Sequence, residues 1–240
     1  VWLMVVFVAG LGMANYALVR AYGTRGVAVT GFFGGLASST PVVGSMLDFA
    51  SQHPKRTKCA VSAVVLAIAA MALRNLLLAV LFTDPAGGVF HIGAPLGAIV
   101  IGGIVLGLFD LEWGEDVEFE LESPFSLRTA LMFGVMFAIV TVAGTLAQTY
   151  FGATGLLVTT FISGFGSSAA AITSVVVLFR SGAIGTSTLT LGVLFATAGS
   201  ILVKVGLALS SPNREFTKGV VSRTTFLLAL AGFVAFLVAW

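Results

Sequence analysis

Charged side chains are scarce in this sequence. Asp, Glu, Lys and Arg together make up 9% of its 240 residues, and 58% of the residues are hydrophobic, whereas a soluble domain carries about a quarter of its residues as charges. So few charges cannot cover the surface of a water-soluble globule. With short loops, a chain of this length has room for about eight helices of roughly 20 apolar residues each. The composition therefore predicts a polytopic protein of the cell membrane, with the lipid bilayer as its partner.

Cysteine and histidine are almost absent. The single cysteine, Cys59, excludes an intramolecular disulfide and a metal site made of cysteines alone. The two histidines, His53 and His91, fall in predicted loops and form no H-x-x-x-H pair. Walker loops and G-x-S-x-G elbows are missing, and the net charge of +2 comes without a basic aromatic stripe. We therefore predict no metal, no cofactor, no nucleic-acid partner and no catalytic residues, and we expect that the protein is not an enzyme.

The apolar runs are continuous and rich in Ala, Leu, Val and Gly, unlike the alternating strands of a membrane β-barrel. The sequence thus predicts an all-α protein, and its 29 glycines suit close packing of membrane helices through small residues. Apolar length, glycine, proline and charge delimit eight predicted spans: Val1–Val19, Val27–Ala50, Cys59–Phe82, Ile92–Phe109, Leu127–Tyr150, Leu156–Phe179, Thr186–Leu209 and Thr224–Trp240.

An acidic stretch, Asp110–Ser126, divides the chain and holds most of its acidic residues. We predict a first membrane repeat over residues 1–110, an acidic linker over 111–126 and a second membrane repeat over 127–240. Within the linker, Val117–Leu121 alternate in polarity. This part is therefore either a short strand or an extended segment outside the membrane.

The two halves of the chain resemble each other at an offset of about 129 residues, which indicates an internal repeat. The segment Gly35–Ser39 (GLASS) matches Gly164–Ser168 (GFGSS), and Arg74 matches Lys204 with one residue of slippage. If each half crosses the membrane four times, the repeats are parallel. If the Gly/Ser segments are re-entrant, the count is odd and the repeats are inverted. The sequence leaves both arrangements open.

The basic residues do not decide the orientation, because eight crossings divide them evenly between the two sides. One side would hold Lys55, Arg56, Lys58, Arg128 and Arg180, and the other Arg20, Arg25, Arg214, Lys218 and Arg223.

Gly, Ser and Thr interrupt two predicted spans at equivalent positions. In the first, Gly31–Ser45 (GFFGGLASSTPVVGS), Pro41 removes a backbone donor and kinks or breaks the helix. The second, Ser163–Ser174 (SGFGSSAAAITS), has the same residue types without a proline. Paired interruptions point to a transport site, although small residues also permit plain helix packing. The candidate path residues are Gly34, Gly35, Ser38, Ser39, Thr40, Pro41, Ser167, Ser168, Thr173 and Ser174.

Two cations fall within apolar spans, where a charge costs at least about 2.5 kcal/mol. Lys204 lies a few residues from the end of its run, and we expect its ammonium to snorkel to the membrane surface. Arg74, with Asn75 beside it, lies roughly 12 Å from Phe82 along a helix, so its guanidinium should face the bundle interior. Asp48 either pairs with Arg74 or marks the lipid–water boundary, and the boundary is the favoured interpretation. Broken helices beside Arg74 and Lys204 suit an anionic group better than a cation.

Several segments resemble the C-terminal membrane domain of MgtC/SapB-family proteins. They are VWLMVVFVAGLG, GFFGGLASSTPV, SPFSLRTALMFG, YFGATGLLVTTFISGFGSSAAAITS and ATAGSILVKVGLAL. The resemblance covers essentially the whole chain and implies the fold more strongly than an activity. It also implies a link to magnesium homeostasis and a preceding N-terminal MgtC-type membrane domain, which fits a sequence that opens in the middle of an apolar run.

The interrupted spans favour a transporter or channel-like protein for a small ion or charged solute, with the Gly/Ser segments lining its path. The alternative is a regulatory or assembly module that binds another membrane protein without transporting anything. A homo-oligomer is compatible with either.

Overall fold

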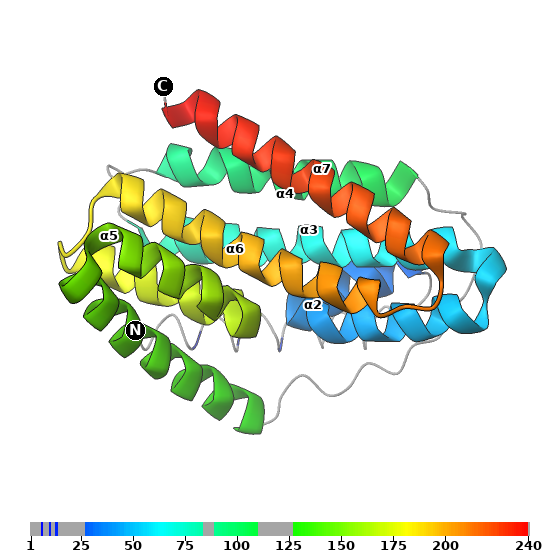
Figure 1. The fold of residues 1–240 in the computed structure, drawn as a ribbon, viewed down its shortest axis with the longest axis horizontal. Coiled ribbons are helices and arrows are strands. Elements are labelled where there is room, and N and C mark those ends of the chain that lie inside the picture. The colour runs from blue at the N-terminus through cyan, green and yellow to red at the C-terminus, as the bar shows by residue number, and fades with distance from the viewer. Residues whose placement is uncertain are drawn as a thin grey trace.

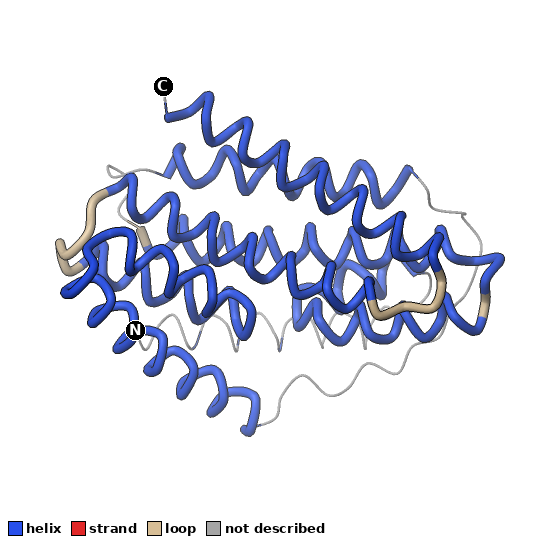
Figure 2. Tube along the Cα trace, viewed as in Figure 1, coloured by secondary structure: helices blue, strands red, loops and turns tan. Residues whose placement is uncertain are grey.

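The computed structural model describes residues 6, 10, 13, 27–83, 89–109 and 127–239. Within these ranges every regular element is helical (Figures 1 and 2), which confirms the predicted all-α class. The elements are α2 (Val27–Gln52), the short 3-10 helix η1 (Pro54–Arg56), α3 (Thr57–Phe82), α4 (Val89–Phe109), α5 (Leu127–Arg180), α6 (Thr186–Leu209) and α7 (Arg214–Ala239). Val6, Gly10 and Met13 are helical, and the rest of the predicted span 1–19, the predicted linker 111–126 and Trp240 lie outside the described residues.

Five helices of the described part are long and apolar enough to cross a membrane. They are Pro54–Phe82, Val89–Phe109, Gly134–Arg180, Thr186–Leu209 and Arg214–Val238. Large apolar side chains on their outer faces are exposed, Phe233 and Ile101 among them, as expected where lipid replaces water as the solvent. The helices therefore describe a multi-pass membrane protein, while the predicted total of about eight crossings is not confirmed.

Helix α2 is broken at Ser38, whose backbone is extended (φ −158°, ψ 115°). Before the break, the helix runs in the same direction as α3, because Gly31 packs against Ala63 and Gly35 against Ala67. After the break, the chain runs through residues 39–52 to the turn that starts α3, so this part is antiparallel to α3. The chain thus reverses at Ser38. We call residues 27–52 the first hairpin.

Helix α5 is broken twice, at Gly152 (φ 64°) and at Ser167 (φ −158°, ψ 105°). Positive φ is the conformation that glycine adopts without steric cost, so Gly152 suits a sharp reversal. The breaks separate three straight pieces, 127–151, 153–166 and 168–180. We call residues 153–180 the second hairpin.

Contacts along α5 show that the chain reverses at both breaks. Gly166 lies against Met136, the hydroxyls of Thr141 and Ser174 hydrogen-bond at 2.7 Å, and Gln148 Nε2 donates to the carbonyl of Ala183. Piece 153–166 therefore runs back along the first piece, and piece 168–180 runs with it again.

Helices α3 and α6 are antiparallel neighbours at the centre of the molecule (Figure 1). Asn75 bonds to Thr197 and Met71 contacts Ser200, so residue numbers rise on one helix as they fall on the other. Helices α4 and α7 also run in opposite directions (Figure 1). Helix α3 lies between all the others and is buried almost throughout its first half. The pairs α3–α6 and α4–α7 are thus both antiparallel.

Small residues allow the close approaches in this core. A Cβ added at Gly35 would overlap the backbone of Ala67, and one added at Gly164 would overlap the backbone of Ala196. On the other side of α3, Gly103 of α4 packs against Ala69. This is the packing expected of membrane helices, which associate through van der Waals contact between small side chains.

The reversals change which basic residues share a side. Asn213, in the turn before α7, donates to the carbonyl of Ala50 and to Thr57 Oγ1, so the turns before α3 and before α7 lie at the same end. The residues gathered at this end are Lys55, Arg56, Lys58, Arg214, Lys218 and Arg223. Arg180, one turn before the start of α6, lies at the opposite end. The predicted division of basic residues is wrong, because it places Lys55 and Arg214 on opposite sides, whereas the turns that hold them lie at the same end.

Candidate functional site

Both hairpin tips lie against the same turn of α3. Arg74 Nη1 donates to the carbonyls of Leu36 (3.2 Å) and Ala37 (3.0 Å), just before the break of the first hairpin. Its neighbour Asn75 accepts a hydrogen bond at 3.3 Å from Ser168, just after the break of the second hairpin. Adjacent residues of α3 therefore bring together two segments that are far apart in the sequence. We call this region the tip site.

Arg74 caps the carboxyl end of piece 27–37. The last carbonyls of a helix have no partner within the helix, and the negative end of the helix dipole attracts a cation. The guanidinium satisfies both requirements, and it faces the interior of the bundle, as its depth in the sequence predicts. The Nε atom of Arg74 is buried and has no hydrogen-bond partner among the described residues. Arg74 thus has donor capacity beyond the two carbonyls that it binds.

Asn75 is fully buried and links the second hairpin to α6. Its Oδ1 accepts from Ser168, and its Nδ2 donates to Thr197 Oγ1 at 3.1 Å. Thr197 in turn donates to the carbonyl of Val193 in its own helix. Buried polar groups that are all satisfied in this way hold one arrangement of the elements. The three side chains therefore fix the second tip against α3 and α6.

The two breaks begin their outgoing helices differently. At the second tip, Ser167 Oγ accepts from the backbone N–H of Ala170 at 3.2 Å, which is a standard N-cap. At the first tip, the third residue after Ser38 is Pro41, which has no N–H to donate. Pro41 therefore lies in the first turn of residues 39–52, where a proline is tolerated. The sequence predicts that Pro41 breaks the helix, whereas the break lies at Ser38.

Lys204 of α6 is 1% exposed, and the prediction that it snorkels is wrong. Its Nζ donates to the backbone carbonyl (2.9 Å) and to the hydroxyl (3.0 Å) of Ser200, which lies four residues towards the interior. Arg74 lies on the facing part of α3, one turn from Met71, which contacts Ser200. Among the described residues no carboxylate pairs with either cation, since Asp48 and Glu215 are both exposed.

Asp48 therefore does not pair with Arg74. It lies ten residues beyond the break of α2, on the exposed side of residues 39–52. This position agrees with the interpretation that Asp48 marks the lipid–water boundary. The tip site is thus electropositive, because its charged groups within the described residues are the guanidinium of Arg74 and the ammonium of Lys204.

The other candidate path residues divide into two groups. Ser39 is buried, while Ser38, Thr40 and Pro41 are exposed at the first tip. Thr173 and Ser174 are buried below the second tip, where Thr173 bonds back to the carbonyl of Ala169 and Ser174 bonds to Thr141. The second group therefore stabilises helix packing and does not line a path in this conformation.

Gly34 and Gly35 are buried on piece 27–37, where Gly35 packs against α3. Gly35 lets the first hairpin lie close to Ala67 of α3, and neither glycine contributes a polar group beyond its backbone. Their contribution to the tip site is therefore steric, because the absence of side chains permits close packing.

Matching structural features lie 129 residues apart, as the breaks at Ser38 and Ser167 and the packed glycines Gly35 and Gly164 show. Met71 and Ser200 form one such pair and contact each other directly at the centre of the molecule. In this register Lys204 is equivalent to Asn75 and not to Arg74. The one-residue slippage that the sequence comparison uses to align the two cations has no counterpart in the geometry.

The sequence prediction misses Thr197 and Ser200, which complete the tip site. Their spacing with Lys204, three and then four residues, puts all three on one face of α6. Three polar residues on one face of an otherwise apolar span is the signal that identifies them. The break at Gly152 lies between the predicted spans Leu127–Tyr150 and Leu156–Phe179, so the sequence prediction of an interruption there is confirmed.

Helices of this length and apolarity, packed around buried polar side chains, define a multi-pass α-helical membrane protein. The chain belongs to the family described as "Domain of unknown function (DUF4010)", whose model matches residues 6–211. An Aquifex aeolicus (strain VF5) protein described as "Uncharacterized protein" is 32% identical over 89 residues, which are 37% of this chain and 39% of that protein. The similar region thus spans less than half of that relative. No solved structure matches the chain.

Proposed function

We propose that this protein transports a small anion, which binds where the two hairpin tips meet α3 and α6. The observation that carries the proposal is the pair of broken helices whose tips both lie against Arg74 and Asn75, near the buried Lys204. Interrupted helices at corresponding positions of two halves are the usual setting of a transport site at the bilayer midplane. Non-helical backbone at that depth persists only where protein or a water-filled cavity satisfies it.

Both hairpins are re-entrant in this proposal, because their pieces are too short to cross. At a rise of 1.5 Å per residue, residues 27–37 span roughly 16 Å and residues 168–180 roughly 20 Å, whereas the hydrocarbon core is about 30 Å thick. Each hairpin therefore enters and leaves on one side. The tips then lie near the middle of the bilayer, next to the crossing of α3 and α6.

Two inverted repeats follow from the same arrangement. Each half contributes one hairpin followed by two long helices, α3 and α4 in the first and α6 and α7 in the second. The antiparallel pairing of α3 with α6 supports a pseudo-two-fold axis in the membrane plane. Inverted repeats give a carrier two equivalent ways to open, one towards each side of the membrane.

The charge at the tip site favours an anion as the solute. Within the part of the chain that the structure describes, no carboxylate pairs with Arg74 or Lys204, and two positive charges repel a cation such as Mg²⁺. The outgoing pieces 39–52 and 168–180 also begin at the tips, and the N–H groups at a helix N-terminus attract negative charge. A bound monovalent or divalent anion would neutralise the positive charges of Arg74 and Lys204.

Lys204→Gln tests the proposal in proteoliposomes. We expect uptake of at least one anion from a panel of chloride, sulfate, phosphate and succinate, and no Mg²⁺ uptake above that of protein-free liposomes. Loss of a charge-assisted contact in a buried site should lower anion uptake about tenfold or more. Lys204→Arg should retain part of it, because the charge remains.

Lys55→Gln is the matched control, because it removes the same charge from an exposed position in η1. It should leave uptake unchanged. Removing an unpaired buried charge also removes a desolvation cost, so Lys204→Gln should fold at least as well as the parent. Mg²⁺ uptake without anion uptake, or equal anion uptake by Lys204→Gln and the parent, would overturn the proposal. No flux of any solute would favour the alternative of a regulatory module.

The resemblance to the MgtC/SapB family, with its implied N-terminal membrane domain and its link to magnesium homeostasis, stays a prediction. Neither the family match nor the relative from Aquifex aeolicus names a transport activity. An anion site remains compatible with an indirect role in ion homeostasis, since charge balance couples anion flux to cation flux.

A further inference from the structure

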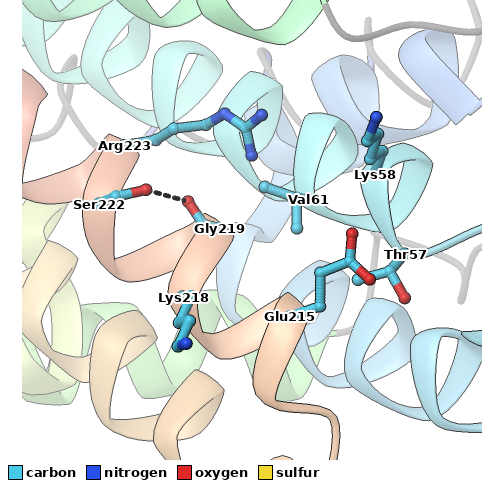
Figure 3. A pocket seen from close by; sticks show the side chains of 8 residues that line it. All are labelled: Thr57, Lys58, Val61, Glu215, Lys218, Gly219, Ser222 and Arg223. Atoms are coloured by element: carbon cyan, nitrogen blue, oxygen red, sulfur yellow. Dashed lines mark hydrogen bonds between the residues drawn. The ribbon is translucent and has the colours of Figure 1, made fainter.

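A second electropositive site lies away from the hairpin tips, between the first turns of α3 and α7. It is a cavity of about 390 Å³ whose lining includes Lys58, Val61, Glu215, Lys218 and Arg223. Figure 3 shows the side chains of Lys58 and Arg223 on either side of Val61, and the carboxylate of Glu215 below Val61. The ammonium of Lys218 points away from both. Two cations thus flank an apolar floor, a third basic residue faces outward, and the three basic residues of the lining outnumber its one carboxylate, that of Glu215.

The cavity lies at the end of the helices where the basic residues gather. Arg223 is roughly 14 Å along α7 from Arg214, but side chains lean towards the N-terminus of their helix. A long arginine therefore brings its guanidinium back towards this surface while its stem remains along the apolar helix. Both charged groups come close to the level where lipid phosphates lie. The excess of lysine and arginine also assigns this end to the cytoplasmic side.

Space for a ligand depends on Gly219 of α7. A Cβ there would lie 2.9 Å from Val61 Cγ2 and 3.2 Å from Arg223 Nη1. The absence of a side chain therefore lets α7 approach α3 closely and leaves room for the guanidinium beside Val61. Below Arg223, one turn further along the same face, Phe226 is exposed. The polar cavity thus continues into an apolar surface at the depth of acyl chains.

We propose that this cavity binds the phosphate of an anionic membrane lipid. The Arg223 guanidinium, which offers planar paired donors, and the Lys58 ammonium would bind the phosphate oxygens. The glycerol region would lie over Val61, and an acyl chain would run along Phe226. Basic pockets between membrane helices are known to bind acidic headgroups in this way. The apolar surface at Phe226 favours a lipid over free phosphate, because free phosphate has no apolar part that could contact Phe226.

Binding of phosphatidylglycerol to the detergent-purified protein tests the proposal, with native mass spectrometry as the readout. We expect phosphatidylglycerol to bind more tightly than phosphatidylcholine. Arg223→Gln and Lys58→Gln should each weaken phosphatidylglycerol binding about fivefold, the effect of one basic residue near a lipid surface. Lys218→Gln removes the same charge from the same cavity wall but points away, so it should leave binding unchanged.

Three results would overturn the proposal. Equal binding of phosphatidylglycerol and phosphatidylcholine would show that the headgroup charge is not recognised. An equal loss in Lys218→Gln and Arg223→Gln would indicate general surface charge instead of a site. Displacement of the lipid by an equal concentration of inorganic phosphate would assign the cavity to a soluble anion. Thermal unfolding of each variant without lipid, followed by the reaction of a thiol probe with buried Cys59, separates lost binding from lost folding.

Discussion

The two hairpins have the same break and are held in different ways. In the first, the extended residue is Ser38, and Arg74 of α3 binds the carbonyls that precede it. In the second, the extended residue is Ser167, and Asn75 of α3 binds the hydroxyl that follows it. The first hairpin is therefore fixed through the carboxyl end of its incoming helix. The second is fixed through the amino end of its outgoing helix.

Helix α3 thus makes hydrogen bonds to both tips. Arg74 and Asn75 belong to α3, whereas the equivalent helix α6 uses Lys204 only on its own Ser200. In a symmetric molecule, α6 would hold the two tips in the same way as α3 does. If the protein is a carrier, we expect this asymmetry to reverse when the site opens to the other side, so that α6 then holds the tips. Substitutions at one hairpin can therefore be compared with the matching substitution at the other, or with a substitution at a neutral position.

The largest effects should come from the glycines that let each hairpin reach its central helix. Gly35→Ala and Gly164→Ala place a methyl group into the backbone of Ala67 and of Ala196 respectively. Overpacking of this kind costs about 3 kcal/mol when backbone must move, so both variants should unfold at clearly lower temperature. The reaction of a thiol probe with Cys59, the single cysteine and a buried one, measures unfolding in detergent.

Gly44→Ala is the control for these two variants. Gly44 also lies in α2, but a Cβ added there has nothing within 4 Å. Alanine favours a helix over glycine by about 1 kcal/mol, so Gly44→Ala should be neutral or stabilising. If all three variants lower the unfolding temperature equally, close approach is not what these glycines provide.

Intermediate effects should separate the two hairpins. Arg74→Met leaves the carbonyls of Leu36 and Ala37 without their donor, which should cost about 2 kcal/mol. Asn75→Leu removes one bond to Ser168 and one to Thr197 and should cost about 1 kcal/mol, because Thr197 keeps its bond within α6. Hydrogen exchange should therefore rise at the first tip in Arg74→Met and at the second tip in Asn75→Leu. Increased exchange at both tips in either variant would contradict separate clamping.

Much of this arrangement is predictable from the sequence, because composition and periodicity report on local structure. The low charge predicts membrane helices, and five long apolar helices in the described residues confirm it. The Gly/Ser segments predict interruptions, and both helices do break there. The residue at which the first helix breaks is harder to predict than the break itself. The sequence suggests Pro41, but a proline also fits the first turn of a helix. The break itself belongs to Ser38.

What the sequence cannot give is pairing between distant residues. Nothing near Asn75 indicates that its partners are Ser168 and Thr197, since the match depends on how α3 crosses α5 and α6. The burial of Lys204 cannot be predicted for the same reason. Its position near the end of α6 predicts that the ammonium reaches the membrane surface, but the packing of neighbouring helices buries it. The side on which each loop lies is also hidden, since it depends on how many of the preceding segments cross the membrane, which composition does not fix.

The smallest effect concerns the first turn after each break. Ser167→Ala removes the N-cap of residues 168–180, where the hydroxyl accepts from Ala170 N–H, and should cost about 1 kcal/mol. Ser38→Ala should cost almost nothing, because Pro41 has no N–H to offer and the Ser38 hydroxyl makes no hydrogen bond among the described residues. The thiol assay at Cys59 compares the two variants directly, and they are the same substitution at the same backbone conformation. If Ser167→Ala and Ser38→Ala destabilise the protein equally, the effect of the two hydroxyls does not come from the N-cap. The solute of the proposed site would then be the first candidate for their binding partner.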